Sequence, residues 1–193
     1  MLATSNGTKS LKITSFTWDN MLLALKGIMY SLLFAGITGA CAKLRFYLPF
    51  TPVPVTGQVF AVLVCGAILG KEYGALSQIF YISFGLMGIP WFVVGPIGPT
   101  GGYLVGFILA PYIIGSIIEK FKSPGFLTTT FAMLSGVFVI YLFGLIQFSL
   151  FMQRGIVESF PLAVIPFIPF DIIKAIAAAG SAIVFLRKMG YRK

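Results

Sequence analysis

Long apolar segments separated by short polar connections dominate this sequence. A membrane-crossing helix needs about 20 apolar residues, and fewer where the helix is short or broken. Charged residues make up 10% of the chain, against about 25% in soluble domains. The chain therefore has too few charged side chains to form the surface of a water-soluble protein. We identify six segments, over residues 21–42, 56–70, 74–89, 103–120, 126–153 and 166–187. They predict an all-α integral membrane protein with six transmembrane helices, formed by a single membrane domain (21–193) after a polar N-terminal lead-in (1–20).

The basic residues are distributed as a membrane topology requires. With the N-terminus inside, Lys43, Arg45 and Arg154 fall outside the cell. The cytoplasmic segments then carry Lys9, Lys12, Lys71, Lys120, Lys122, Arg187, Lys188, Arg192 and Lys193. Cytoplasmic connections of membrane proteins are enriched in Lys and Arg. The pattern predicts that both termini are cytoplasmic, and it explains the net charge of +9 without a nucleic-acid partner.

Two of the predicted outer connections have the composition of structured loops. "LPFTPVPVTGQ" (48–58) contains three prolines, which fix φ and favour a stiff, extended chain. "GIPWFVVGPIGPTGGYLVG" (88–106) combines glycines and prolines with aromatic side chains. Irregular backbone at membrane depth occurs only where protein or a cavity surrounds it. We therefore expect these two loops, outer loops 1 and 3, to cover a ligand pocket. Gly101 and Gly102 would let backbone amides approach a ligand, or would form a tight turn.

Asp171 and Lys174 are ionisable residues at the start of the last apolar segment. Their spacing of three places them on one helix face, and this face continues through Ala175, Ala178 and Ala182. A charged side chain at the centre of a membrane helix costs about 2.5–3.5 kcal/mol on insertion scales, and such residues commonly mark substrate paths. The alternative is a structural ion pair that fixes the last helix.

The same pair suggests what kind of solute a pocket here would bind. A carboxylate accepts hydrogen bonds and an ammonium donates them, which suits a solute with N–H donors and an acceptor or anionic group. Trp91, Tyr81 and Tyr103 would supply apolar walls. Lys43 and Arg45 follow the first segment and either extend to the membrane interface or form a positive rim that attracts a carboxylate.

Small residues recur every four positions in the first segment, at Gly27, Ser31, Ala35 and Gly39. A stripe of this kind lets another helix approach closely in a membrane. It serves either packing within the chain or docking of a separate membrane subunit.

Residues needed for catalysis are scarce. The chain has no histidine, which removes the commonest general base and metal ligand. It has no G-x-x-x-x-G-K-[ST] nucleotide loop. With five acidic residues in all, a carboxylate-bound metal site is not expected. We therefore expect neither an enzyme nor a cofactor-binding protein.

Three separated motifs together resemble the BioY family. They are "PFTPVPVTGQ" after the first segment, "GPTGGYLVGF" opening the fourth and "PFDIIKA" opening the sixth. The family comprises the biotin-binding S components of energy-coupling factor (ECF) transporters. The resemblance implies six helices in a bacterial or archaeal cell membrane and capture of biotin from outside. It also implies partnership with a transmembrane coupling (T) subunit and two cytosolic ATPase subunits.

The resemblance also implies roles for individual residues. Asp171 and Lys174 would contact the ligand, since biotin's ureido ring offers N–H donors and a carbonyl oxygen and its valerate offers a carboxylate. The sequence leaves open which of the two residues meets the ureido ring and which meets the valerate. The docking surface for the coupling subunit would be the small-residue stripe of the first helix. Further ligand contacts would come from Gln58, Thr100, Gly101, Gly102 and Tyr103. Two alternatives stay open: an S component for another vitamin, and a non-catalytic membrane scaffold in which the Asp–Lys pair is structural.

Overall fold

A computed structural model describes residues 18–91 and 98–188. The chain there is helical apart from one short two-stranded ribbon. The elements in chain order are α1 (Trp18–Cys41), β1 (Arg45–Phe46), β2 (Val55–Thr56), α2 (Gln58–Leu86), α3 (Gly101–Ile118), α4 (Phe126–Met152), α5 (Ile156–Ala163), the 3₁₀ turn η1 (Ile165–Phe167) and α6 (Ile168–Lys188).

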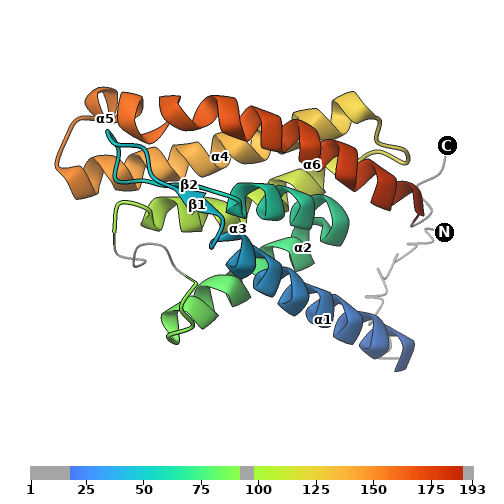
Figure 1. The fold of residues 1–193 in the computed structure, drawn as a ribbon. Helices are drawn as coiled ribbons and strands as arrows, with labels where there is room; N and C mark the ends of the chain where they lie inside the picture. Colours follow the sequence, from blue (N-terminus) through green and yellow to red (C-terminus); the bar gives the residue numbers. More distant parts are fainter. Residues whose placement is uncertain (1–17, 92–97, 189–193) are drawn as a thin grey trace, which may run out of the picture.

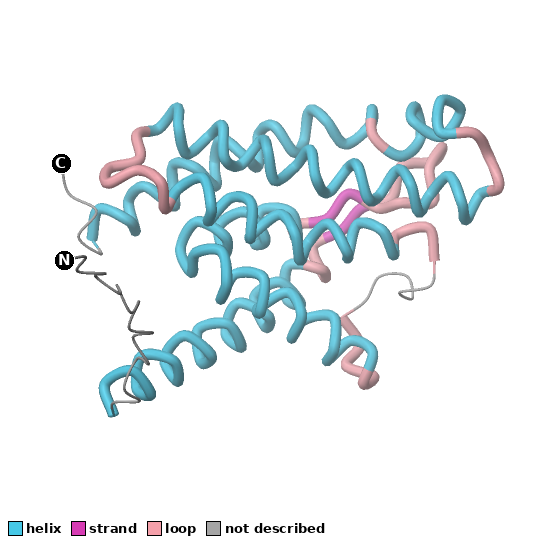
Figure 2. Tube along the Cα trace, turned by 180° about the vertical axis from the view of Figure 1, so that it is seen from behind, coloured by secondary structure: helices cyan, strands magenta, loops and turns pink. Residues whose placement is uncertain are grey.

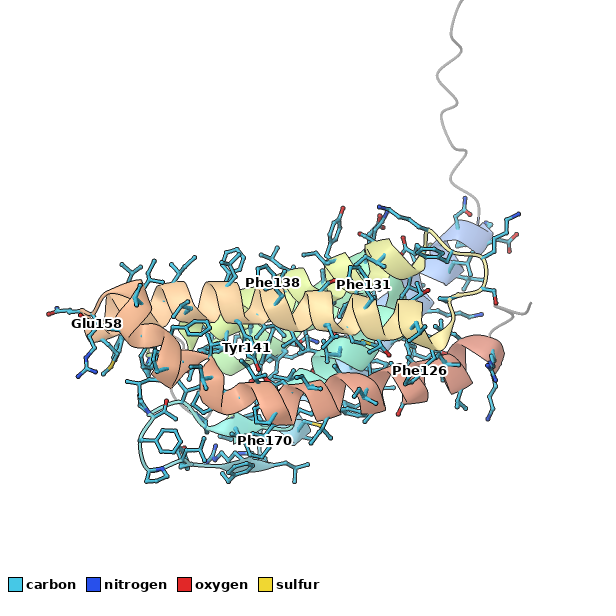
Figure 3. The ribbon with its side chains drawn as sticks, turned by 90° about the horizontal axis from the view of Figure 1, so that it is seen from above. Phe126, Phe131, Phe138, Tyr141, Glu158 and Phe170 are labelled. Atoms are coloured by element: carbon cyan, nitrogen blue, oxygen red, sulfur yellow. The ribbon has the colours of Figure 1, made fainter. Side chains whose placement is uncertain are left out.

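Five helical stretches of the described chain are long and apolar enough to cross a membrane: α1, α2, α3, α4 and the run from Ile156 to Lys188. Figure 3 shows Phe131 and Phe138 pointing outward from α4, and they are 65% and 67% exposed. A surface with many such side chains suits lipid rather than water. The predicted class, a helical integral membrane protein, is confirmed as far as helix content, helix length and apolar composition are concerned.

The predicted segments correspond to the observed helices with one addition. The first, fourth, fifth and sixth match α1, α3, α4 and α6 to within a few residues. The second and third segments correspond to the two halves of α2 and extend beyond its ends by two and three residues. The helix α5, eight residues long, lies between the fifth and sixth segments and was not predicted.

The helix α2 reverses direction at Gly70. Gly70 has φ 76° and ψ −175°, a backbone conformation that only glycine adopts readily. The side chains of Gln58 and Tyr81 are 23 residues apart but joined by a hydrogen bond of 2.6 Å, whereas a straight helix would separate them by about 35 Å. The two halves of α2 therefore lie against each other, and both ends of α2 meet at the same side of the molecule.

Small residues let the helices approach one another closely. A Cβ atom added at Gly66 of α2 would lie 2.6 Å from the Cα of Pro111 in α3, and one added at Gly106 of α3 would lie 2.6 Å from the Cα of Ile140 in α4. Close backbone approach of this kind is the usual basis of helix packing in membranes. It joins α2, α3 and α4 into one bundle, and α6 packs against both α2 and α4.

The ends of the helices fall into two groups (Figure 1). The start of α1, the α3–α4 turn and the end of α6 lie at one end of the molecule, on the right in this view. The ribbon's connecting loop and α5 lie toward the opposite end. The helix α1 packs against α2 and lies at the edge of the bundle.

The first predicted outer loop forms an ordered ribbon. Strands β1 and β2 pair antiparallel, with Arg45 opposite Thr56 and Phe46 opposite Val55. The connection between them turns inward, since Thr51 and Val53 are 5% exposed. Figure 2 shows the strands beside the helices. In the third predicted outer loop, residues 92–97 lie outside the described chain.

Candidate functional site

The first turns of α6 carry an ion pair. Lys174 Nζ lies 2.7 Å from Asp171 Oδ1, and the two side chains are 19% and 5% exposed. The spacing of three residues thus brings the two charged groups into direct contact, as expected from helix geometry. Asp171 lies in the first turn of the helix, where the helix dipole favours a negative charge.

Tyr141 of α4 is a second partner of this carboxylate. Its hydroxyl donates a hydrogen bond of 2.8 Å to Asp171 Oδ2, and Figure 3 shows its side chain between α4 and α6. The two oxygens of a carboxylate offer about four acceptor positions, so Asp171 retains capacity for further donors. Lys174 likewise has two N–H groups beyond the one directed at Asp171.

A cavity lies beside this ion pair. The ribbon, α2, α3, α4, η1 and α6 all contribute to its wall. Its lining comprises Val53, Pro54, Val55, Thr56, Gln58, Val59, Tyr81, Thr100, Tyr103, Leu104, Phe107, Ile140, Tyr141, Phe167, Asp171 and Lys174. A mostly apolar concave wall with a few convergent polar groups is typical of small-molecule sites. Of the nine residues predicted to contact a ligand, this cavity brings together six: Gln58, Tyr81, Thr100, Tyr103, Asp171 and Lys174.

Gln58 and Tyr81 form the polar part of the α2 wall. The Gln58 amide nitrogen donates to the Tyr81 hydroxyl oxygen at 2.6 Å, and both residues are buried. This contact exists because α2 reverses at Gly70, which returns the end of the helix to its start. It fixes the position of the Gln58 amide at the cavity wall.

Tyr103 contributes a ring rather than a free hydroxyl. Its hydroxyl donates to the carbonyl oxygen of Ala163, at the end of α5, at 2.5 Å. The hydroxyl of Thr51 in the ribbon donates to the adjacent carbonyl of Leu162 at 2.9 Å. These two bonds hold the α5–η1 junction against α3 and the ribbon, and so position Phe167 in the cavity wall.

Three predicted ligand contacts do not line the cavity. Trp91 packs behind it, with its ring centroid 5.4 Å from that of Tyr81 and its indole N–H bonded to the Tyr81 carbonyl oxygen at 3.2 Å. Gly102 faces α4, where an added Cβ would lie 2.1 Å from the carbonyl oxygen of Phe143. Gly101 is the first residue of α3. In this structure Gly102 therefore serves helix packing.

The sequence analysis missed several residues of the cavity wall. Tyr141 had a usable signal, since a polar hydroxyl inside an apolar segment needs a partner. Val53 and Val55 lie in the loop 48–58 that was expected to cover the pocket, although neither was named as a contact. Other missed residues are Val59, Leu104, Phe107, Ile140 and Phe167. Their types are the same as those of the surrounding core, so nothing in the sequence separates them from it.

The small-residue stripe of α1 packs inside the chain. A Cβ added at Gly27 would lie 2.3 Å from the Tyr73 ring, and one added at Gly39 would lie 2.0 Å from the Trp91 ring. Ser31 and Ala35 have no exposed surface. In this structure these four residues pack against the chain's own side chains, as the packing alternative predicts, and docking of a coupling subunit on this stripe stays a prediction. A separate subunit could reach them only if α1 moved away from α2.

Within residues 18–91 and 98–188, no group of three or more His, Cys, Asp or Glu side chains is placed to hold a metal ion. The chemistry that the cavity offers is therefore hydrogen bonding by a carboxylate, an ammonium and an amide between aromatic and aliphatic walls.

Comparisons with known proteins agree with this picture. Residues 11–191 match the model of the BioY family. The chain is 36% identical over 159 residues to the biotin transporter BioY of Thermotoga maritima, covering 78% of this chain and 92% of the relative. It is 31% identical over 171 residues to the biotin transporter BioY of Rhizobium etli, covering 81% and 91%.

A solved structure also matches over nearly the whole chain. It is the crystal structure of the S component for biotin from an ECF-type ABC transporter, with a TM-score of 0.80 and 27% identity, covering 91% of this chain and 96% of that one. The resemblance inferred from the three sequence motifs is thereby confirmed. The chain belongs to the BioY family.

Proposed function

We propose that this chain is the biotin-binding S component of an ECF-type importer. The observation that carries the proposal is the cavity in which Asp171, Lys174 and Gln58 meet between aromatic walls. The relatives are named as biotin transporters, and the solved structure is named as the S component for biotin from an ECF-type ABC transporter. The residues that line the cavity offer hydrogen-bonding groups and apolar walls, so we assign binding.

The groups in the cavity match the functional groups of biotin. The ureido ring of biotin has two N–H donors and a carbonyl acceptor. The free acceptor positions of Asp171 suit the N–H groups, and the remaining N–H donors of Lys174 suit the carbonyl oxygen. The apolar thioether ring and side chain of biotin suit the walls formed by Tyr81, Tyr103 and Phe107.

We assign six membrane passes to the chain, with both termini in the cytoplasm. The reversal of α2 at Gly70 supports counting its two halves as separate, short passes. Arg187 and Lys188 end α6, and Lys120 and Lys122 lie in the turn between α3 and α4. Lys71 lies beside Glu119, directly after the end of α3. These residues therefore belong to the end of the molecule where the start of α1, the α3–α4 turn and the end of α6 meet. An excess of Lys and Arg marks cytoplasmic connections. The ribbon and the cavity mouth then face outward, in the plasma membrane of a bacterium or archaeon.

ATP hydrolysis is assigned to partner subunits, a transmembrane coupling (T) subunit and two cytosolic ATPases. The chain contains no nucleotide-binding loop. We place docking of the coupling subunit on the outward face of α1, which includes Leu32, Leu33, Gly36 and Ala40. These residues are exposed, and a Cβ added at Gly36 would meet no atom within 4 Å. We choose this face because the stripe of Gly27, Ser31, Ala35 and Gly39 is occupied by packing within the chain.

One observation favours the alternative of a membrane scaffold. Asp171 already has two partners within the chain, Lys174 and Tyr141, so the pair is satisfied without a ligand. A scaffold with a structural ion pair needs nothing more. The same alternative predicts that no vitamin stabilises the fold.

Calorimetry on the purified chain in detergent tests the proposal, with biotin as ligand and thiamin as comparator. Binding to the folded state alone stabilises a protein by RT ln(1 + [L]/Kd), about 2.7 kcal/mol at a hundredfold excess over Kd. We expect a biotin isotherm and a matching rise in Tm, with no response to thiamin. Binding of thiamin instead would indicate an S component for another vitamin. Folded protein that responds to neither would support the scaffold.

A further inference from the structure

The chain turns back on itself after the end of α2. Gly88 has φ 100°, a left-handed backbone conformation that glycine adopts without steric cost. The backbone N–H of Ile89 then bonds to the carbonyl oxygen of Phe84 at 3.1 Å, and the N–H of Trp91 bonds to the carbonyl oxygen of Ile89 at 2.8 Å. This turn returns Trp91 to the side of the helix that ended at Leu86.

The Trp91 side chain lies between α2 and α1. On the α2 side, its ring centroid lies 5.4 Å from that of Tyr81 and 6.2 Å from that of Phe84. On the α1 side, the ring occupies the place that a side chain at Gly39 would take, because an added Cβ there would overlap the ring atoms. The ring is therefore in contact with both helices, and it requires a glycine at position 39.

Two hydrogen bonds tie this segment to the same two helices. The indole N–H of Trp91 donates to the carbonyl oxygen of Tyr81 at 3.2 Å. Lys43, two residues after the end of α1, donates from its ammonium group to the carbonyl oxygen of Pro90, the residue before Trp91. The position of the ring thus depends on α2 on one side and on the end of α1 on the other.

Tyr81 connects this ring to the ligand cavity. Its side chain is fully buried and lines the cavity. Its hydroxyl oxygen accepts the amide N–H of Gln58 at 2.6 Å, and Gln58 is a polar group of the cavity wall. A shift of the Trp91 ring would therefore tilt Tyr81 and move the Gln58 amide with it.

We propose that Trp91 is a positioning residue for the ligand cavity, which sets the wall formed by Tyr81 and Gln58 and makes that wall depend on the place of α1. This inference rests on the proposed function, because it concerns the same cavity. The alternative is that the ring only fills the space between two helices. The two roles differ in one measurable property: only in the first does Gly39, on α1, affect ligand affinity through the ring.

Gly39→Ala tests the proposal on the intact chain in detergent. The added Cβ displaces the ring, so we expect biotin affinity to fall about threefold to tenfold by calorimetry, as is typical of mutations that act through an intervening contact. Gly27→Ala is the matched control. Gly27 lies about 18 Å along the same helix, and its added Cβ would overlap the Tyr73 ring instead. It should lower Tm and leave biotin affinity unchanged.

A double-mutant cycle with Trp91→Leu separates positioning from packing. Because Trp91→Leu removes the ring, Gly39→Ala should weaken biotin binding in the wild-type background and have no further effect in the Trp91→Leu background. Additive losses in the two variants would overturn the proposal. Equal losses of affinity in Gly39→Ala and Gly27→Ala would also overturn it, because they would show general damage to the packing of α1.

Tryptophan fluorescence gives an independent readout. The sequence has two tryptophans, and Trp18 is 77% exposed at the start of α1, so Trp18→Phe leaves Trp91 as the source of indole emission. A ligand in contact with Tyr81 constrains the ring behind it, so we expect biotin to change this emission with the Kd that calorimetry gives, and thiamin to leave it unchanged.

The fluorescence result decides even if Gly39→Ala does not fold. Biotin binding without any change in Trp91 emission would overturn the positioning role while the proposed function stood. Folded wild type that binds no biotin would overturn both proposals.

Discussion

Tyr141 of α4 donates its hydroxyl hydrogen to Oδ2 of Asp171 in α6 at 2.8 Å, while Lys174 occupies Oδ1. The carboxylate is thus held from two sides, by its own helix and by the neighbouring one. This arrangement fixes the orientation of Asp171 before any ligand arrives. A preorganised group loses little conformational freedom on binding, which favours tight capture of a solute.

Tyr141→Phe tests this arrangement. The variant keeps the ring but leaves Asp171 Oδ2 without its protein donor, and a lost hydrogen bond to a charged group costs about 1.5–3 kcal/mol. We expect biotin affinity to fall severalfold to tenfold, with a lower Tm in the absence of ligand. Tyr112→Phe is the control, since Tyr112 is 49% exposed on α3. Equal affinity in wild type and Tyr141→Phe would show that the bond does not orient the carboxylate for binding.

Asp171→Asn and Lys174→Ala should each weaken biotin binding at least tenfold, but they should differ in stability. Lys174→Ala leaves a carboxylate that is 5% exposed without its cation, and breaking a buried pair costs about 3–5 kcal/mol. Asp171→Asn leaves Lys174, which is 19% exposed and can be hydrated, so its cost is smaller. Thermal unfolding without ligand measures the difference. Identical Tm values for the two variants would contradict this asymmetry.

The ion pair shows what the sequence was able to predict. Asp171 and Lys174 are conspicuous because ionised groups are rare in an apolar segment. Their spacing of three residues places both side chains on one helix face, which predicts their ion pair. The long helices were predictable for a similar reason, since length and hydropathy decide membrane spans. The bounds of α1, α3, α4 and α6 accordingly lie within a few residues of the predicted segments.

The rest of the site depends on contacts between distant segments. Gln58 and Tyr81 meet only because α2 reverses at Gly70, and Tyr103 meets Ala163 only because α5 packs on α4 and its last residue lies within reach of α3. Gly102 illustrates the opposite error. The glycine pair was expected to permit a ligand approach or to form a tight turn, whereas Gly102 faces the backbone of α4 and serves helix packing. The stripe of α1 was ambiguous in the same way, because small residues do not reveal which helix they face.

Gly70→Ala tests the reversal of α2. The positive φ of Gly70 is strained for any residue with a side chain, and an added Cβ would lie 2.6 Å from Glu119 Oε1. That oxygen accepts the backbone N–H of Lys71 at 3.0 Å, so the contact cannot relax freely. We expect a loss of about 1–3 kcal/mol in stability, measured by unfolding in detergent. Gly180→Ala, at an open position of α6, is the control and should be neutral or stabilising.

Tryptophan substitutions on α1 distinguish its two faces. Ala35→Trp points inward, where the native residue has no exposed surface, so we expect it to disrupt the packing of α1 on α2 and lower Tm. Gly36→Trp points outward into open space, so we expect an unchanged Tm and unchanged biotin affinity.

The outward substitution also tests the docking face. Small residues permit close helix approach in membranes, so a bulky indole at position 36 should block association with the coupling subunit. Pull-down from membranes that co-express the coupling and ATPase subunits measures this effect, and Gly180→Trp on α6 controls for bulk alone. Full recovery of the coupling subunit by Gly36→Trp would place docking elsewhere. Loss of recovery in Gly36→Trp but not in Gly180→Trp would assign the outward face of α1 to the partner while the inward stripe holds the fold together.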